Sequence, residues 1–376
     1  MKPLGLYIHI PFCRRKCYYC DFVSFPNRTD LIDEYIGAVI AEAQLYADVL
    51  SDHIVDTVFI GGGTPTMLSA AQMERLLNGL KQCGNWHPAE VTIEANPETL
   101  NEEKAASYAR CGVNRLSLGL QTHDDAILTA IGRRHTWQDF ITALDIAQRY
   151  FHNINADTIF ALPGQSIENY TETLRRLIDL DIPHISCYAL KLEEGTRLAA
   201  EFSGADEETD REMYHGAAQI LTSAGYTHYE TSNFALPGFE CRHNLKYWTG
   251  GDYLGLGVAA HSYSCSETKT RHSNTESLEE YLCIVKNGVK PAAHTDVLTE
   301  TDELTEYLML HLRLANGIDA DGYARRFGED FLSRFAEPIK TAQNAELIAI
   351  DAHGIKPTLK GFDLQNVLIG EFIKKL

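Results

Sequence analysis

The sequence lacks any hydrophobic run long enough to cross a membrane, and its opening, MKPLGLYIHIPFC, is too short in apolar residues for a secretory signal. Internal repeats and low-complexity linkers are also missing. With 44% apolar and 23% charged residues over 376 positions, the composition is that of an ordinary globular protein of about two domains. We therefore expect a cytoplasmic protein without a membrane span, for which peripheral contact with a membrane surface stays open.

Basic residues are scarce. Lys and Arg number 33 against 52 Asp and Glu, so the formal net charge is −19. No basic run stands out that could release counterions from a polyphosphate backbone. This balance argues against nucleic acid as a partner.

A disulfide framework is not expected either. The chain has nine cysteines, an odd number, and no export signal. Six cysteines stand alone and are expected to be small buried side chains: Cys83, Cys111, Cys187, Cys241, Cys265 and Cys283.

The other three cysteines crowd into PFCRRKCYYCDF (11–22), as Cys13, Cys17 and Cys20. Structural zinc requires four ligands, usually as two separated pairs, and no second pair exists. A cubane iron–sulfur cluster on three thiolates would leave one iron open for a small ligand, which suits catalysis. Unligated thiols this close together would invite oxidation. We favour the cluster over zinc and over free thiols.

Apolar β-rich runs alternate with amphipathic helical stretches over the first 235 residues. The runs are LGLYIHI (4–10), DTVFIG (56–61), EVTIEA (90–95), NRLSLGL (114–120), NINADTIF (153–160) and HISCYAL (184–190). Helix start signals lie between them, including Thr136 with Asp139, and Ser166. Six βα units predict an α/β fold, either a partial barrel or a doubly wound sheet.

The alternation fades after residue 235. We expect a parallel βα domain over 1–235, a connecting region rich in His, Gly and aromatic residues over 236–290, and a smaller, mainly helical, winged-helix-like domain over 291–376. A hairpin is expected at ELIAIDAHGIKPTLK, near the C-terminus. The last part has more acidic than basic residues, which favours a scaffold or lid over a DNA-binding module.

Unusual polar residues fall where the predicted strands end. In parallel βα architectures this is where ligands bind. In strand order these features are the cysteine loop, GGGTPT (61–66), Glu94, Gln121, Asp157 and Ala189. The six strands therefore point to a single site.

These motifs carry a family resemblance. CRRKCYYC has the Cys-x3-Cys-x2-Cys spacing of the radical SAM superfamily, and with GGGTPT it resembles that superfamily's partial (βα)6 barrel. YIHIPFC, IGGGTPT, GLQ, RRH, ALPGQ and CRHNLKYW resemble the coproporphyrinogen III dehydrogenase group, most closely its haem-chaperone branch, over nearly the whole chain. The resemblance implies a [4Fe-4S] cluster on the three cysteines, which cleaves S-adenosylmethionine (SAM) to methionine and a 5′-deoxyadenosyl radical. It also implies a low-potential electron donor of flavodoxin or ferredoxin type.

The resemblance further implies a site for the methionyl part of SAM. Gly61, Gly62 and Gly63, followed by Thr64, would let the backbone approach this group, where a side chain would collide with it. Arg133 would pair with the methionyl carboxylate as a planar bidentate donor. A plain glycine turn and a surface salt bridge are the alternative interpretations, and a second arginine follows Arg133 directly.

The remaining SAM contacts follow from the same resemblance. They are Glu94 on the ribose or the methionyl amine, Gln121 and Asp157 on the ribose, Tyr19 and Ala189 beside the adenine, and Tyr7 beside the cluster. A carboxylate at the buried end of a strand is costly without such a partner. Tyr7 has an alternative interpretation as a core side chain.

Two departures distinguish this chain from the decarboxylating dehydrogenases of the group. Those enzymes usually carry a fourth cysteine two positions after the third, where this chain has Phe22. They also carry an N-terminal extension, whereas only 12 residues precede Cys13. Decarboxylation of coproporphyrinogen is therefore not our first expectation.

HNLKYW, from His243 to Trp248, matches the haem-associated motif of the chaperone branch. The match implies His243 as an axial haem ligand, with Tyr247 and Trp248 packing on the macrocycle. The alternative is a buried histidine with two core aromatics. Other candidate ligands are His9, His135 and His261.

Three functions follow, in order of preference. The first is a haem-binding protein with a radical SAM site that delivers haem to haem-requiring acceptor proteins. The second is an oxygen-independent coproporphyrinogen III oxidase that produces protoporphyrinogen IX. The third is a radical SAM enzyme acting on RNA, which the acidic composition disfavours.

Overall fold

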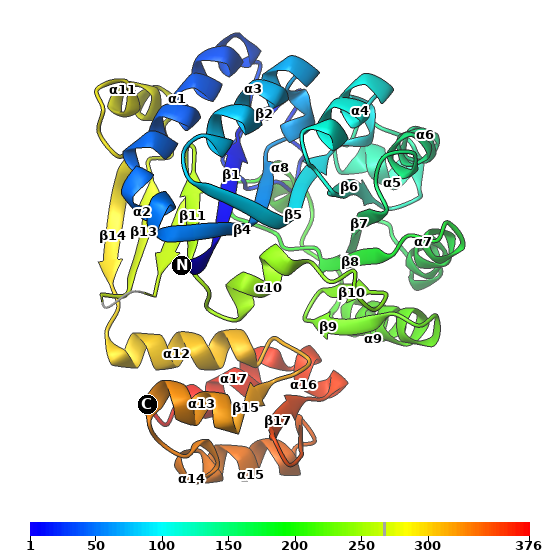
Figure 1. The fold of residues 1–376 in the computed structure, drawn as a ribbon. Helices are drawn as coiled ribbons and strands as arrows, with labels where there is room; N and C mark the ends of the chain where they lie inside the picture. The colour runs from blue at the N-terminus through cyan, green and yellow to red at the C-terminus, as the bar shows by residue number, and fades with distance from the viewer. Residues whose placement is uncertain (266–267) are drawn as a thin grey trace.

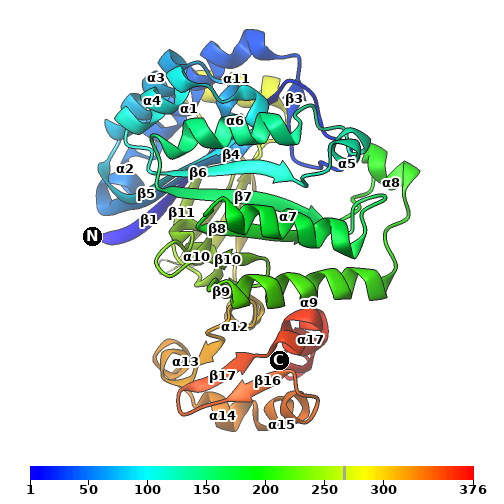
Figure 2. The ribbon, with the colours of Figure 1, turned by 90° about the vertical axis from the view of Figure 1, so that its right-hand side faces the viewer.

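The computed structural model describes residues 1–265 and 268–376, and most of the chain before residue 298 forms one curved sheet with helices along its outer side (Figures 1 and 2). Six parallel strands build its centre: β1 (Lys2–Ile10), β4 (His53–Gly62), β5 (Asn85–Ala95), β6 (Arg115–Gln121), β7 (Asn153–Phe160) and β8 (His184–Ala189). They lie side by side in chain order. A doubly wound sheet would reverse its order at a switch point, so the partial barrel is confirmed.

The helices of this part lie between the strands in sequence. They are α1 (Ile32–Leu45), α2 (Ala47–Asp52), α3 (Ala70–Lys81), α4 (Glu102–Arg110), α5 (Asp125–Ala130), α6 (Trp137–Gln148), α7 (Ile167–Asp179), α8 (Arg197–Glu201) and α9 (Glu207–Ser223). The expected start signals are confirmed. Thr136 and Asp139 form a capping box on α6, and Ser166 accepts the backbone N–H of Asn169 on α7.

Further strands extend the sheet to 12. On one side β11 (Tyr253–Leu256) runs parallel to β1 and continues into the antiparallel β12 (His261–Ser264), β13 (Thr270–Asn274) and β14 (Ala292–Val297); on the other lie β10 (Asn233–Ala235) and β9 (Thr227–Glu230). Residues 236–290, expected as a connecting region, thus supply three strands of this sheet, with α10 (Arg242–Trp248) and α11 (Leu278–Lys286). Separately, β2 (Phe12–Cys13) pairs with β3 (Phe25–Pro26) across the base of the cysteine loop.

The C-terminal region has its own aromatic core, which includes Tyr323, Phe331, Phe335 and Phe372. Its elements are α12 (Glu300–His311), β15 (Ile318–Asp319), α13 (Ala320–Phe327), α14 (Phe331–Arg334), α15 (Ala336–Asn344), β16 (Ile348–Ile350), β17 (Gly354–Pro357), α16 (Leu359–Asp363) and α17 (Gln365–Ile373). The expected hairpin is confirmed as β16–β17.

Backbone hydrogen bonds join this region to the sheet. The N–H of Thr231 donates to the carbonyl of Arg313 at 3.1 Å, and the N–H of Ala315 donates to that of Tyr229 at 3.0 Å. Residues 313–315 therefore lie beside the end of β9, where Leu314 and Glu230 form an isolated antiparallel bridge. No helix of the described residues is long and apolar enough to cross a membrane.

Candidate functional site

A cavity of about 520 Å³ lies at the carboxyl ends of the parallel strands. Twelve of the predicted cluster and SAM residues line it: Cys13, Cys17, Tyr19, Cys20, Gly62, Gly63, Thr64, Glu94, Gln121, Arg133, Asp157 and Ala189. Tyr7 and Gly61 stay outside this lining. The strand-end argument thus located the cavity, while Tyr7 points to its neighbour His9, whose Nδ1 is 3.0 Å from the phenol oxygen.

The cysteine loop closes one end of the cavity. Cys13 is buried, with Sγ 3.6 Å from Thr64 Oγ1, and Cys17 and Cys20 are half-buried. Burial raises the pKa of the Cys20 thiol to about 11, so a metal would have to displace its proton. Among the described residues, no three His, Cys, Asp or Glu side chains are grouped closely enough to hold a single ion.

The glycine run leaves room for the protein's own groups. A Cβ on Gly63 would lie 3.0 Å from Cys13 Sγ, and one on Gly62 would lie 2.5 Å from the His9 ring. Gly62 also has φ +108°, a region that side chains rarely adopt. We expected these glycines to admit a ligand. The structure adds that a side chain on Gly63 would displace Cys13, and that one on Gly62 would displace His9 of β1.

Arg133 reaches into the cavity from the segment after α5. Its guanidinium donates to Cys17 Sγ at 3.6 Å, to Asn96 Oδ1 at 3.0 Å and to the carbonyl of Gly119. Its Nε is buried without a hydrogen-bond partner in the described residues, which leaves one donor for an anionic ligand group. Arg134, in contrast, is 54% exposed in its side chain and pairs with Glu98 at 3.7 Å. The structure therefore separates the two adjacent arginines.

Two buried carboxylates face the cavity. Glu94 Oε2 accepts the N–H of Gly62 at 3.1 Å, and Asp157 accepts from Ser117 and Asn155, both at 2.9 Å. Burial, with Asp157 nearby, raises the pKa of Glu94 to about 8, and burial also raises the pKa of Asp157. A positively charged ligand would stabilise the ionised form of these two carboxylates.

Gln121 enters the cavity through a β-bulge. The β6–β7 register steps from Gly119 opposite Asp157 to Gln121 opposite Thr158, so Leu120 is the extra residue. Gln121 has φ +75°, a conformation that costs a non-glycine residue about 1–3 kcal/mol. The sequence carries no signal of this bulge. It turns the Gln121 side chain towards the site.

The HNLKYW segment forms α10, which lies at the opposite end of the strands, between the sheet and the C-terminal region (Figure 1). Glu90, which lies in the middle of β5 opposite Thr57 of β4, caps the N-terminus of α10 by accepting the N–H groups of Arg242 at 2.9 Å and His243 at 3.0 Å. Lys246 pairs with Asp56 at 3.0 Å. These contacts hold α10 against the amino-terminal halves of the strands.

His243 is fully buried under this helix. Its Nδ1 lies 3.0 Å from Thr57 Oγ1 and its Nε2 lies 2.8 Å from the Tyr247 hydroxyl. Burial, with Lys246 nearby, lowers the pKa of the imidazole to about 3. Trp248 is half-buried, with the Arg313 guanidinium 5.9 Å from its ring centre. The structure thus leaves the three motif residues apart from the cysteine cavity.

Two of the three other candidate haem ligands also have hydrogen-bonded rings. His9 Nε2 lies 2.8 Å from the carbonyl of Val23, and His135 Nε2 lies 3.1 Å from that of Leu120. His261 is exposed on β12.

Comparison with known proteins gives this geometry a class. The Radical SAM superfamily profile matches residues 7–177, and the HemN C-terminal domain profile matches residues 298–364. The solved structure titled "Coproporphyrinogen III oxidase (HemN) from Escherichia coli is a Radical SAM enzyme" has a TM-score of 0.86 and 25% identity, and the match covers 100% of this chain and 91% of that one. The fold is that of a radical SAM protein.

Relatives define the family within that class. The chain is 36% identical to "Heme chaperone HemW" of Lactococcus lactis subsp. lactis, over 99% of this chain and 98% of the relative. It is 32% identical to the protein of the same name from Bacillus subtilis, over 98% and 99%. The chain belongs to the HemW family of the radical SAM superfamily.

Proposed function

We propose that Cys13, Cys17 and Cys20 hold a [4Fe-4S] cluster and that SAM binds beside it in the same cavity. Three features support the fit: the thiols share one lining with the polar residues, Gly63 has no room for a side chain against Cys13, and Arg133 keeps a buried donor without a partner. When bound, the two groups supply one-electron cleavage chemistry, for which a low-potential flavodoxin or ferredoxin provides the electron.

The chain's own residues would orient SAM and exclude water. Arg133 would hold the methionyl carboxylate, since its Nε is free to donate. Glu94 would accept from the methionyl amine or the ribose, Asp157 would accept from the ribose, and Gln121 would reach the ribose from its bulge. Tyr19 and Ala189, which line the same cavity, would flank the adenine.

Arg133→Ala should weaken SAM binding by about 2 kcal/mol, roughly 30-fold, because a charge-assisted pair of a buried guanidinium nitrogen is lost. Cluster content should stay as in wild type. Isothermal titration of the reconstituted protein with SAM measures the effect. Arg134→Ala is the matched control, because that side chain is exposed and pairs only with Glu98 in the described residues. Equal losses in both variants would remove Arg133 from the site.

SAM binding should become tighter as pH rises and level off above about 8. The raised pKa leaves Glu94 mostly protonated at neutral pH, and a cationic ligand favours the carboxylate, so binding releases a proton below that pKa. The gain is at most about tenfold per pH unit. Glu94→Gln should remove this dependence, and since SAM's own amine titrates in both proteins, the difference isolates Glu94. Parallel pH profiles for the two proteins would contradict the assignment.

We further propose that the protein binds haem and delivers it to haem-requiring acceptor proteins. The observation that carries this proposal is the match over nearly the full length to relatives named "Heme chaperone HemW". His243 remains the proposed axial ligand through Nε2, with Nδ1 oriented by Thr57. Both ring nitrogens of His243 are bonded and the ring is fully buried. Helix α10 therefore has to move away from the amino-terminal halves of the strands before a macrocycle can reach the imidazole.

Oxygen-independent oxidation of coproporphyrinogen III is the second candidate, favoured by the TM-score of 0.86 to the HemN structure. One anaerobic experiment separates the two. The reconstituted protein, with SAM and an electron donor, is tested side by side for haem binding and for loss of coproporphyrinogen carboxylates. We expect a haem spectrum and no turnover. Turnover at an enzyme's rate without haem binding would favour the second candidate.

A further inference from the structure

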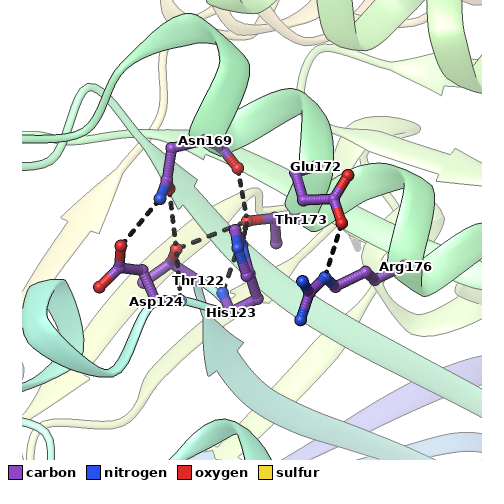
Figure 3. A network of polar contacts seen from close by, with 7 residues as sticks. All are labelled: Thr122, His123, Asp124, Asn169, Glu172, Thr173 and Arg176. Atoms are coloured by element: carbon purple, nitrogen blue, oxygen red, sulfur yellow. Dashed lines mark hydrogen bonds and ion pairs between the residues drawn. The ribbon is translucent and has the colours of Figure 1, made fainter.

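A polar network joins the turn after β6 to the inner face of α7 (Figure 3). From the turn come Thr122, His123 and Asp124, and from α7 come Asn169 and Thr173. Thr122 and Thr173 are fully buried, although both carry hydroxyl groups. Neither Asn169 nor Thr173 lines the cavity at the strand ends. The network therefore lies behind the proposed SAM site.

Thr173 is the centre of the network. Its Oγ1 accepts the backbone N–H of His123 at 3.4 Å and lies 2.8 Å from His123 Nδ1 and 3.5 Å from Thr122 Oγ1. The same hydroxyl donates to the carbonyl of Asn169 at 3.2 Å, which ties it to the axis of α7. One buried side chain thus fixes both the backbone and the ring of His123.

Asn169 extends the network to α5. Its Nδ2 donates to Asp124 Oδ2 at 2.9 Å. The other oxygen of Asp124 caps α5 by accepting the N–H groups of Ala126 at 2.8 Å and Ile127 at 3.1 Å. The orientation of this short helix therefore depends on a side chain of α7.

Three parts of the proposed site are attached to this turn. Gln121, with its strained φ of +75°, directly precedes Thr122. At the far end of α5, the N–H of Arg133 donates to Leu128 at 2.9 Å, and the carbonyl of Ile131 accepts the N–H of Tyr18 in the cysteine loop at 3.0 Å. Gln121, Arg133 and the cysteine loop are thus supported by the same turn and by α5.

We propose that Thr173 and Asn169 are positioning residues for SAM: they hold the 122–124 turn, which sets Gln121 directly and Arg133 and the cysteine loop through α5. The inference rests on the proposed SAM site. Left-handed backbone persists where surrounding contacts determine it. On one side of Gln121 the carbonyl of Leu120 is bonded to His135, and on the other side α7 holds the residues that follow. Loss of the Thr173 hydroxyl would let the bulge relax and would separate groups that must act on one ligand.

Thr173→Val, which keeps the shape and removes the hydroxyl, should weaken SAM binding about tenfold, the effect of losing one buried hydrogen-bond centre. Iron content should stay as in wild type. Thr173→Ser should restore binding, and Asn169→Ala should weaken it independently. Thr142→Val is the matched control, because Thr142 on α6 makes the same bond to the carbonyl four residues earlier, Gln138, at 2.9 Å, without contact to the turn. SAM affinity is measured by titration calorimetry, together with the SAM-induced change in the EPR spectrum of the reduced cluster.

The outcomes are distinguishable. Wild type that holds iron but does not bind SAM would contradict the proposed function itself. Wild-type SAM affinity and EPR response in both Thr173→Val and Asn169→Ala would overturn the positioning role. If Thr173→Val fails to fold, the other two variants decide. Weakened SAM binding in Asn169→Ala together with wild-type SAM binding in Thr173→Ser supports the role. Unchanged SAM binding in Asn169→Ala overturns it.

Discussion

Replacing Cys13, Cys17 and Cys20 together with Ala should abolish all cluster iron, together with the brown chromophore and the paramagnetic signal of its reduced form. The three thiols are the cysteines that line the cavity at the strand ends, and they lie on one loop. A cubane cluster that loses its three protein ligands has nothing left to hold it. Iron and sulfide analysis after anaerobic reconstitution, with the absorbance spectrum, measures the loss.

A second triple variant is the matched control. Cys83, Cys265 and Cys283 are the cysteines outside the loop that are not fully buried, and replacing them with Ala removes the same number of thiols. This protein should keep four irons per chain. Retention of four irons in the loop variant would contradict the cluster, the SAM site and the positioning role together.

His243→Ala and Tyr247→Phe should change haem affinity in opposite directions. His243→Ala removes the proposed ligand, so the Soret shift of haem coordination should disappear and affinity should fall at least roughly tenfold. Tyr247→Phe removes the hydroxyl that lies 2.8 Å from Nε2, so the nitrogen is free to bind iron and affinity should rise about fivefold. Haem titration followed by absorbance measures both.

Structural damage has to be separated from loss of a ligand, because His243 is fully buried. Thr57→Val is the control: it removes the Nδ1 partner at 3.0 Å and keeps the imidazole. It should destabilise the fold by about 1–3 kcal/mol and lower haem affinity, because Nδ1 loses the group that orients it, but the Soret shift of haem coordination should remain since the imidazole is still present. The assignment fails if His243→Ala, with normal cluster content, binds haem with the spectrum and affinity of wild type.

The parallel strands could be predicted because their signal is local. Short β-rich runs alternate with helices whose start signals, such as Thr136 with Asp139, also form in the structure. The extension of the sheet by β11–β14 could not be predicted in the same way. Pairing of β11 with β1 joins residues about 250 positions apart, and no local pattern specifies such a contact.

The candidate site was also predictable only in part. Parallel strands bring their carboxyl ends to one edge, so most of the residues predicted to bind SAM were expected to meet there, and they line one cavity. Burial of His243 was one of two interpretations of its motif, and the sequence could not decide between them, because the position of α10 depends on Glu90 from a distant strand. The bulge before Gln121 and its support from Thr173 have no sequence signal, since both arise from register and packing.

The pairing of residues 313–315 with β9 bears on any shortened version of this protein. Main-chain hydrogen bonds, from Thr231 to Arg313 and from Ala315 to Tyr229, attach the C-terminal region to the sheet. A chain that ends at β14 would leave the Tyr229 carbonyl and the Thr231 N–H without these partners at the edge of the sheet, and an open edge is a template for pairing with other chains. Aggregation is therefore the expected fate of such a truncation, and limited proteolysis should release no stable barrel fragment.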